Sequence, residues 1–153
     1  MRVVIQRVSS ASVISDGILT GKIEHGLMLL LGVAKGDEKL DAELLSAKIA
    51  KLRIFSDENG KMNLSLLDVG GSALIVSNFT LNANYAHGNR PDYFASAVPS
   101  EAIPLYERFV SLVKERIPFV ATGVFGADMQ IELCADGPVT IVMDSLQLRK
   151  DKK

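Results

Sequence analysis

Cysteine and histidine are almost absent from this sequence. Cys134 is the only cysteine among 153 residues, so the chain can form no internal disulfide bond and no cluster of thiolate metal ligands. His25 and His87 are the only histidines, and neither stands in an HExxH or HxE pattern. The sequence therefore predicts no metal site, and we expect no cofactor.

Long apolar runs and an excess of positive charge are also missing. No stretch approaches the roughly 20 apolar residues that a membrane-spanning helix needs, and the sequence starts with an alternating segment, residues 2–8, in place of a signal peptide. The net charge is −1, whereas proteins that bind along a nucleic-acid duplex carry basic side chains that neutralise its phosphates. We expect a cytoplasmic protein without a membrane partner, whose contact with any RNA is confined to a single-stranded end.

The common motifs of nucleotide binding and covalent catalysis are absent as well. The sequence contains no GxGxxG, no GxxxxGK[ST] and no GxSxG nucleophile elbow. A covalent hydrolase with Thr80 as the nucleophile and His87 as its base stays open. This mechanism requires the fold to bring the two side chains together, and nothing in their spacing does so.

The hydrophobic pattern predicts one strand-rich α/β domain at residues 1–148. Apolar residues that alternate or form short runs indicate strands at 2–15, 26–33, 72–81, 119–124, 129–134 and 139–144. Helical spacing indicates helices at 40–52 and from a cap at Ser100 to Pro118. We expect these two helices to pack on a mixed or antiparallel, partly barrel-like sheet. Residues 149–153, which include three lysines, should form a frayed tail.

Several connections between these elements carry signals of their own. Asp16-Gly17 and the segment 57–60 indicate hairpin turns. Residues 77–81 (SNFTL) end a buried strand, where backbone N–H groups of a sheet can bind a ligand. Residues 136–140 (DGPVT) indicate a tight turn, and the aperiodic stretch 82–99 is long enough to be a candidate binding loop. Each segment also has an ordinary structural explanation when it is taken alone.

Taken together and in this order, these segments resemble the D-aminoacyl-tRNA deacylase family. The similarity runs nearly end to end and includes IQRV at 5–8, ASV at 11–13, GV at 32–33, RIFSD at 53–57, GKMN at 60–63, SNFTL at 77–81, GNRP at 88–91, TG at 122–123, ADMQ at 127–130 and GPVT at 137–140. Two positions depart from the usual family motifs. Asn78 stands where glutamine is typical, which keeps a side-chain amide, and Ala135 stands where asparagine is typical, which removes one.

The resemblance implies a homodimer that hydrolyses the ester bond of D-aminoacyl-tRNA as chiral proofreading in translation. Gly137-Pro138 would be a cis dipeptide that reaches from one subunit into the active site of the other. There its carbonyl oxygens would occupy the space that the Cβ of an L-residue needs, so L-substrates would be excluded by a clash. Because glycine has no Cβ, glycyl-tRNA should also be a substrate.

The resemblance also places the catalytic residues at the end of a buried strand, at Ser77, Asn78, Phe79 and Thr80. Backbone N–H groups around Phe79 and Thr80 would stabilise the oxyanion that forms when water attacks the ester. The 2′-hydroxyl of the terminal adenosine would help to activate that water. Met129 and Phe125 are the candidates for the adenosine pocket, and Arg7 is the candidate for a polar contact near the site that the dimer completes.

Two other functions stay open beside this one. A non-catalytic binder of aminoacylated tRNA ends would sequester its ligand and leave the ester intact. A covalent esterase that used Thr80 would instead hydrolyse small esters that contain no RNA. Activity on small esters, and the fate of a tRNA ester, distinguish the three functions.

Overall fold

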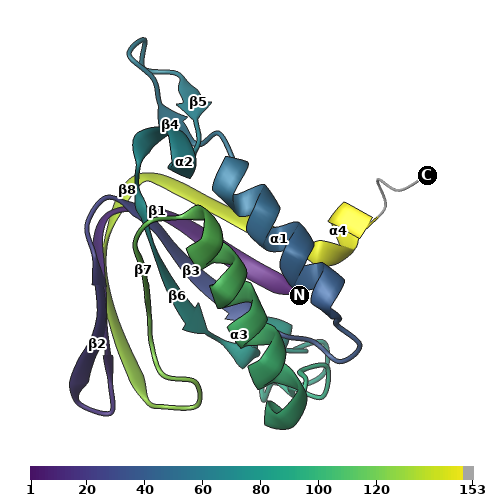
Figure 1. Ribbon diagram of the computed structural model, residues 1–153. Helices are drawn as coiled ribbons and strands as arrows, with labels where there is room; N and C mark the ends of the chain where they lie inside the picture. Colours follow the sequence, from purple (N-terminus) through teal and green to yellow (C-terminus); the bar gives the residue numbers. More distant parts are fainter. Residues whose placement is uncertain (150–153) are drawn as a thin grey trace.

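The first three strands of the chain pair antiparallel, the first with both the second and the third. The structure, a computed structural model that describes residues 1–149, contains β1 (Arg2–Ser15), β2 (Ile18–Ile23) and β3 (Gly26–Gly32) (Figure 1). The chain turns from β1 into β2 at Asp16-Gly17, where both φ angles are positive, as the sequence predicts for a hairpin turn. β2 and β3 pair antiparallel with successive parts of β1, so they line the same edge of β1.

Three further strands complete the sheet. β6 (Ser72–Ser77) pairs parallel with β3, and β7 (Val120–Thr122) pairs parallel with β6. β8 (Met129–Asp144) pairs antiparallel with β1 along the edge opposite β2 and β3. β2 bends so close to β7 that a Cβ on Gly21 would lie 2.9 Å from the carbonyl oxygen of Thr122. The sheet is therefore mixed and partly barrel-like, which confirms the predicted fold class.

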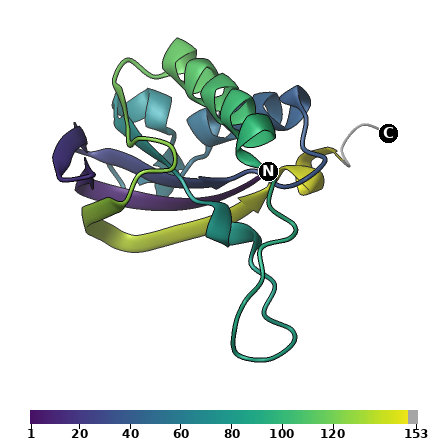
Figure 2. The ribbon, with the colours of Figure 1, turned by 90° about the horizontal axis from the view of Figure 1, so that it is seen from below.

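Hydrophobic cores lie on both faces of this sheet. α1 (Lys39–Lys51) and α3 (Pro99–Arg116) cover one face and bury the larger core against it (Figure 2). Leu29, Ile75 and Phe109 of this core have no exposed surface. The smaller core, which includes Val13 and Leu74, fills the inside of the curled sheet. The two long helices thus pack as predicted, because their apolar positions recur with helical spacing.

Short elements connect the larger ones. β4 (Phe55–Ser56) and β5 (Met62–Leu64) form the second predicted hairpin. α2 (Leu66–Val69) begins with a capping box between Ser65 and Asp68, and α4 (Ser145–Arg149) follows β8. The sequence predicted only the two long helices, because α2 and α4 are too short to show a helical period.

Several predicted strands have different limits in the structure. The strand expected at 72–81 ends at Ser77, because its partner β3 ends at Gly32 and the chain then turns into the 3₁₀ helix η1 (Phe79–Asn82). The strands expected at 129–134 and 139–144 form the single strand β8. Its pairing with β1 shifts on either side of Val8, so the segment predicted to be a turn bulges out of a continuous strand.

Two predicted helix and tail boundaries also change. Ser100 is not the cap of α3, because the helix begins at Pro99 and its cap is Val98. Proline suits the first helical position, where its fixed φ fits and no N–H is needed. Arg149, which we assigned to the tail, is the last residue of α4. The rest of the predicted tail, residues 150–153, lies outside the described residues.

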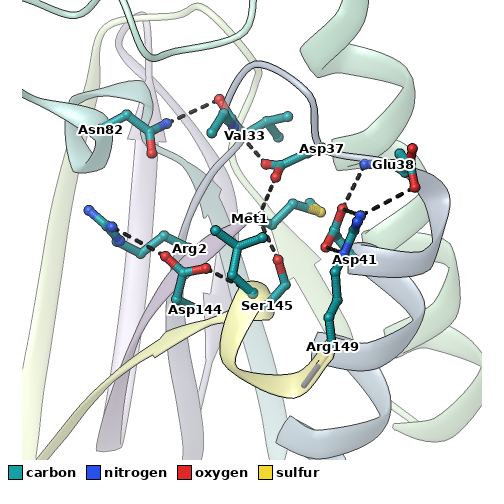
Figure 3. A network of polar contacts seen from close by, with 12 residues as sticks. Met1, Arg2, Val33, Asp37, Glu38, Asp41, Asn82, Asp144, Ser145 and Arg149 are labelled. Atoms are coloured by element: carbon teal, nitrogen blue, oxygen red, sulfur yellow. Dashed lines mark hydrogen bonds and ion pairs between the residues drawn. The ribbon is translucent and has the colours of Figure 1, made fainter. Parts of the chain in front are cut away.

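A network of polar groups joins the start of β1 to α1 and α4 (Figure 3). The α-ammonium group of Met1 donates hydrogen bonds to Asp37 Oδ1 and Ser145 Oγ, each at 2.7 Å. Asp41, whose side chain is fully buried, accepts a hydrogen bond of 2.8 Å from Arg149 Nε and one from the backbone N–H of Glu38. The carboxylate of Asp41 therefore both caps α1 and holds α4 against it.

Asp41→Asn is expected to lower the free energy of unfolding by about 2 kcal/mol near neutral pH, because it removes charged hydrogen bonds. Burial opposes the charge of Asp41, but the hydrogen bonds from Arg149 and Glu38 outweigh burial and hold the pKa of Asp41 below its ordinary 3.8. A carboxyl pKa that is lowered by folding stabilises the protein above pH 3.8, and this stabilisation is lost as the pH falls through the lowered value.

Urea unfolding of wild type and Asp41→Asn at a series of pH values measures this effect. The difference in unfolding free energy between the two proteins should shrink as the solution is acidified below the ordinary carboxyl pKa. Glu58→Gln, which changes an exposed carboxylate, is the control. A difference that stays constant across the whole series would contradict the assigned role of Asp41.

Candidate active site

A cavity of about 550 Å³ opens at the carboxyl ends of the parallel strands β3 and β6. Ligands commonly bind at this end of parallel strands, because the loops that follow them leave backbone groups free. Its wall consists of the end of β6, the loop before α3, the first turn of α3 and the segment between β7 and β8. It is lined by Val33, Ser77, Asn78, Phe79, Tyr93, Ser96, Ala97, Pro99, Ala102, Phe125, Gly126, Ala127, Asp128 and Met129.

Two N–H groups just after β6 have no hydrogen-bond acceptor in the described residues, and Phe79, which carries the first, lines the cavity. The N–H of Asn78 still bonds to the sheet, at 2.8 Å from the carbonyl oxygen of Leu31. The next two N–H groups, of Phe79 and Thr80, have no hydrogen-bond acceptor among residues 1–149. They occupy the first positions of η1, where a helix offers no internal acceptor. Two adjacent donors are thus available to a ligand oxygen.

Thr80 and His87 are not brought together. The hydroxyl group of Thr80 donates a hydrogen bond to Asn78 Oδ1, and Thr80 is exposed and does not line the cavity. His87 lies in the loop between η1 and α3, and within residues 1–149 no hydrogen bond joins it to Thr80. The amide of Asn78, the residue that departs from the family motif, therefore fixes the Thr80 side chain.

Two residues of the cavity were missed by the sequence analysis. Ser96 Oγ donates a hydrogen bond of 2.9 Å to the carbonyl oxygen of Phe79, and the rings of Tyr93 and Phe79 pack edge to face with centroids 5.1 Å apart. Both contacts hold the first residue of η1 in place from the loop before α3. The only sequence signal for them was the unusual length of that loop.

The predicted adenosine-pocket residues both line the cavity. Phe125 and Met129 flank the turn between β7 and β8, and the ring of Phe125 packs against Tyr106 of α3 with centroids 5.7 Å apart. The turn is held by the β1–β2 hairpin, because Asp16 N–H donates to the carbonyl oxygen of Asp128 at 2.9 Å, and Asp128 N–H donates to Asp16 Oδ1. The structure thus places an apolar wall opposite the end of β6.

Gly137-Pro138 lies away from this cavity in the same chain. The Gly137-Pro138 peptide bond is cis, and the bulge that contains it faces Arg7 of β1. Arg7 is 9% exposed; its Nε donates to the carbonyl oxygen of Asp136 at 3.1 Å, and its Nη1 donates to that of Ile54 at 2.7 Å. One guanidinium group therefore fixes the bulge to the β4–β5 region.

The pairing pattern places the bulge and the cavity at opposite ends of β3. Arg7, opposite the bulge, pairs with Leu27 near the start of β3, whereas Ser77 at the cavity pairs with Leu31 near its end. A single chain does not bring Gly137-Pro138 to Phe79. Any common site for these two segments requires a second copy of the chain.

The described part of the chain contains neither a cluster of metal ligands nor a membrane-spanning helix. Among residues 1–149, no group of three or more His, Cys, Asp or Glu side chains is arranged to hold a metal ion. Within the same residues, no helix has the length and apolar character that crossing a membrane demands.

Sequence comparison connects this site to known proteins. The sequence model of the family described as D-Tyr-tRNA(Tyr) deacylase matches residues 4–144. A D-aminoacyl-tRNA deacylase from Chloroflexus aurantiacus is 55% identical over 153 residues, which cover 100% of this chain and 96% of that protein. A protein of the same name from Thermosipho africanus is 56% identical over 145 residues, which cover 95% of this chain and 97% of the relative.

Solved structures share the fold. A structure named "c-Myc DNA Unwinding Element Binding Protein" superposes with a TM-score of 0.88 at 36% sequence identity, over 94% of this chain and 98% of the other. One named "Structural Analysis of a probable eukaryotic D-amino acid tRNA deacylase" has a TM-score of 0.80 at 14% identity, over 93% of this chain and 97% of the other, and supports the fold alone. Because the family match and the identities extend over nearly the whole chain, the chain belongs to the D-Tyr-tRNA(Tyr) deacylase family.

Proposed function

We propose that the chain hydrolyses the ester bond of D-aminoacyl-tRNA, releasing free tRNA and a D-amino acid, as chiral proofreading in translation. Two observations that agree with each other support this proposal. Relatives named D-aminoacyl-tRNA deacylase match 95% and 100% of the chain, and the cavity opens beside two N–H groups that have no acceptor within the described residues. Aminoacyl-tRNA is made and used in the cytoplasm, so we also propose that the chain acts there.

In the proposed mechanism, the N–H groups of Phe79 and Thr80 bind the ester carbonyl oxygen. They stabilise the negative charge that develops on this oxygen when water attacks, and one such donor is typically worth about 2.7–4 kcal/mol. The terminal adenosine lies against Phe125 and Met129, and its 2′-hydroxyl helps to activate the water. No nucleophilic side chain is needed, which agrees with the hydrogen bond that the Thr80 hydroxyl group already donates to Asn78.

Chirality is selected, in this proposal, by Gly137-Pro138 of a second copy in a homodimer. The carbonyl oxygens of the dipeptide occupy the space that the Cβ of an L-residue needs, so an L-substrate clashes and a D-substrate does not. The position of the bulge supports this arrangement, because it projects at the end of β3 that is remote from its own cavity. Glycyl-tRNA escapes the clash and is also hydrolysed.

Incubation with paired D- and L-tyrosyl-tRNA tests the function. The purified chain, at a concentration well below that of the substrate, should release D-tyrosine over many turnovers and leave L-tyrosyl-tRNA as stable as it is in buffer. Glycyl-tRNA should lose its ester as well. A chain that only binds aminoacylated ends would leave the D-ester as stable as in buffer or more stable, and that result would contradict the proposal.

Thr80→Ala is expected to keep kcat/KM for D-tyrosyl-tRNA within about tenfold of wild type. The variant retains the backbone N–H that the mechanism uses and loses only a hydroxyl group that bonds to Asn78. Deacylation rates and a circular dichroism spectrum, which reports folding, provide the measurement. A folded variant that deacylates no faster than buffer would show that the hydroxyl group is the nucleophile.

A further inference from the structure

Exposed aromatic side chains gather on one loop beside the cavity. Tyr85 and Phe94, which are 81% and 78% exposed, are the most exposed large apolar or aromatic residues in the described part of the chain. Both belong to the segment between η1 and α3, here called the projecting loop (residues 84–94), which stands out from the body of the domain (Figure 2). Exposing rings of this size to water costs free energy, so two of them on one loop indicate a binding surface.

The projecting loop has a defined shape. At its base, the backbones of Asn84 and Asp92 exchange two hydrogen bonds of 2.9 Å, and the Asn84 amide donates to the Asp92 carboxylate. The same two side chains accept hydrogen bonds from the N–H groups of Ala86 and Phe94. Both arms of the loop are thus tied together, which lowers the conformational entropy that binding would cost.

The segment that follows the projecting loop forms part of the wall of the cavity. Just after the loop, Ala95 accepts a hydrogen bond from Lys35 N–H, and Ala97 donates one to Val33 at the end of β3. Ser96, between them, bonds to Phe79. The projecting loop is therefore continuous with the cavity wall, which Tyr93, Ser96 and Ala97 help to line.

We propose that the projecting loop binds the unpaired nucleotides that precede the terminal adenosine of the substrate. Their bases stack on Tyr85 and Phe94, and a phosphate group contacts Arg90, which is exposed and forms no ion pair within residues 1–149. This inference rests on the proposed function, because it extends the same site from the adenosine to the preceding nucleotides.

The composition of the loop favours single-stranded RNA over a second copy of the chain. Beside the two rings, its tip carries His87, Asn89 and Arg90, which are all exposed, and the one carboxylate of the loop, on Asp92, is engaged in holding the base. Aromatic rings together with amide and guanidinium groups are typical of sites for unpaired nucleotides. A contact between protein copies would expose a more continuous apolar surface.

Comparison of two substrates tests the loop. D-tyrosyl-tRNA reaches the projecting loop, whereas D-tyrosyl-adenosine ends inside the cavity. The double variant Tyr85→Ala, Phe94→Ala should raise KM for D-tyrosyl-tRNA about tenfold or more, because stacking on one ring is worth about 1–3 kcal/mol per base. It should leave kcat on both substrates and KM for D-tyrosyl-adenosine unchanged. Phe119→Ala, which removes an exposed ring just before β7, is the matched control.

Binding of fluorescently labelled, uncharged tRNA gives the same comparison without turnover. The double variant should raise Kd about tenfold, and Arg90→Gln should reduce the slope of log Kd against log salt concentration by about 0.7. Absence of D-tyrosyl-tRNA hydrolysis by wild type would refute the proposed function. The binding data would still show whether the projecting loop contacts tRNA. Unchanged tRNA affinity, an equal loss on both substrates, or dissociation of a dimer into monomers by the double variant would overturn the inference.

Discussion

Gly137→Ala is expected to lower the D/L ratio of kcat/KM for tyrosyl-tRNA by about tenfold or more, through a gain of L-hydrolysis. The φ angle of Gly137 is +133°, and a Cβ there would lie 2.7 Å from Val139 N and 2.9 Å from Val139 Cγ2. The backbone must therefore shift, and the carbonyl oxygens that are proposed to exclude L-residues shift with it. Hydrolysis of glycyl-tRNA should change less, because this substrate has no Cβ.

Gly60→Ala is the matched control for this variant. Gly60 also has a positive φ angle, of +75°, but a Cβ at this position meets nothing within 4 Å. Both variants thus carry the strain of an L-residue at positive φ, and only one disturbs the bulge. The ratio of the two rates cancels any uniform loss of active protein. An unchanged D/L ratio in folded Gly137→Ala protein would show that Gly137-Pro138 does not exclude L-substrates.

Phe79→Pro is expected to lower kcat for D-tyrosyl-tRNA about 100-fold relative to Phe79→Ala, because proline lacks the N–H that stabilises the oxyanion. Proline suits this position, since Phe79 is the first residue of η1 and the preceding Asn78 is extended, with φ −148° and ψ 91°. Both variants lose the ring that packs on Tyr93, so their difference isolates one hydrogen-bond donor.

Single-turnover rates of the two Phe79 variants provide this measurement. KM should differ less between them than kcat, because the donor acts on the charge that develops in the transition state. Circular dichroism and the mass of the particle in solution check that both variants keep the wild-type fold and assembly. Equal rates for the proline and alanine variants would show that the Phe79 N–H takes no part in catalysis.

Local patterns were sufficient to predict most of the fold. The alternation in β1, the apolar run of β3 and the helical spacing in α1 each depend on residues close in sequence, and the structure confirms all three elements. The end of β6 was predicted wrongly, because it depends on the length of a partner strand that is distant in the sequence. For the same reason β8 appeared as two strands: its bulge is defined by the pairing with β1.

The candidate site likewise contains residues that could be predicted and residues that could not. Resemblance named Ser77, Phe79, Phe125 and Met129, and the structure places all of them around one cavity, although their roles stay predictions. Ser96 was not found, because its hydrogen bond to Phe79 depends on the path of a loop that has no period. The resemblance named the N–H groups of Phe79 and Thr80, but the helix η1 that leaves them without an acceptor was not predicted, since that segment has the apolar pattern of a continuing strand.

Mixed dimers of two variant chains test the central claim most directly. One chain carries Phe79→Pro and the other carries Gly137→Ala, and dimers that contain one of each are isolated through two affinity tags. If each site joins Phe79 of one chain to Gly137 of the other, one site in the mixed dimer is intact and the other carries both changes. The account predicts that mixed dimers hydrolyse D-tyrosyl-tRNA and have lost the L-hydrolysis of the Gly137→Ala homodimer. Mixed dimers that still hydrolyse L-tyrosyl-tRNA would contradict it, because the only working site would then combine an unchanged Phe79 with the Gly137→Ala substitution of the same chain.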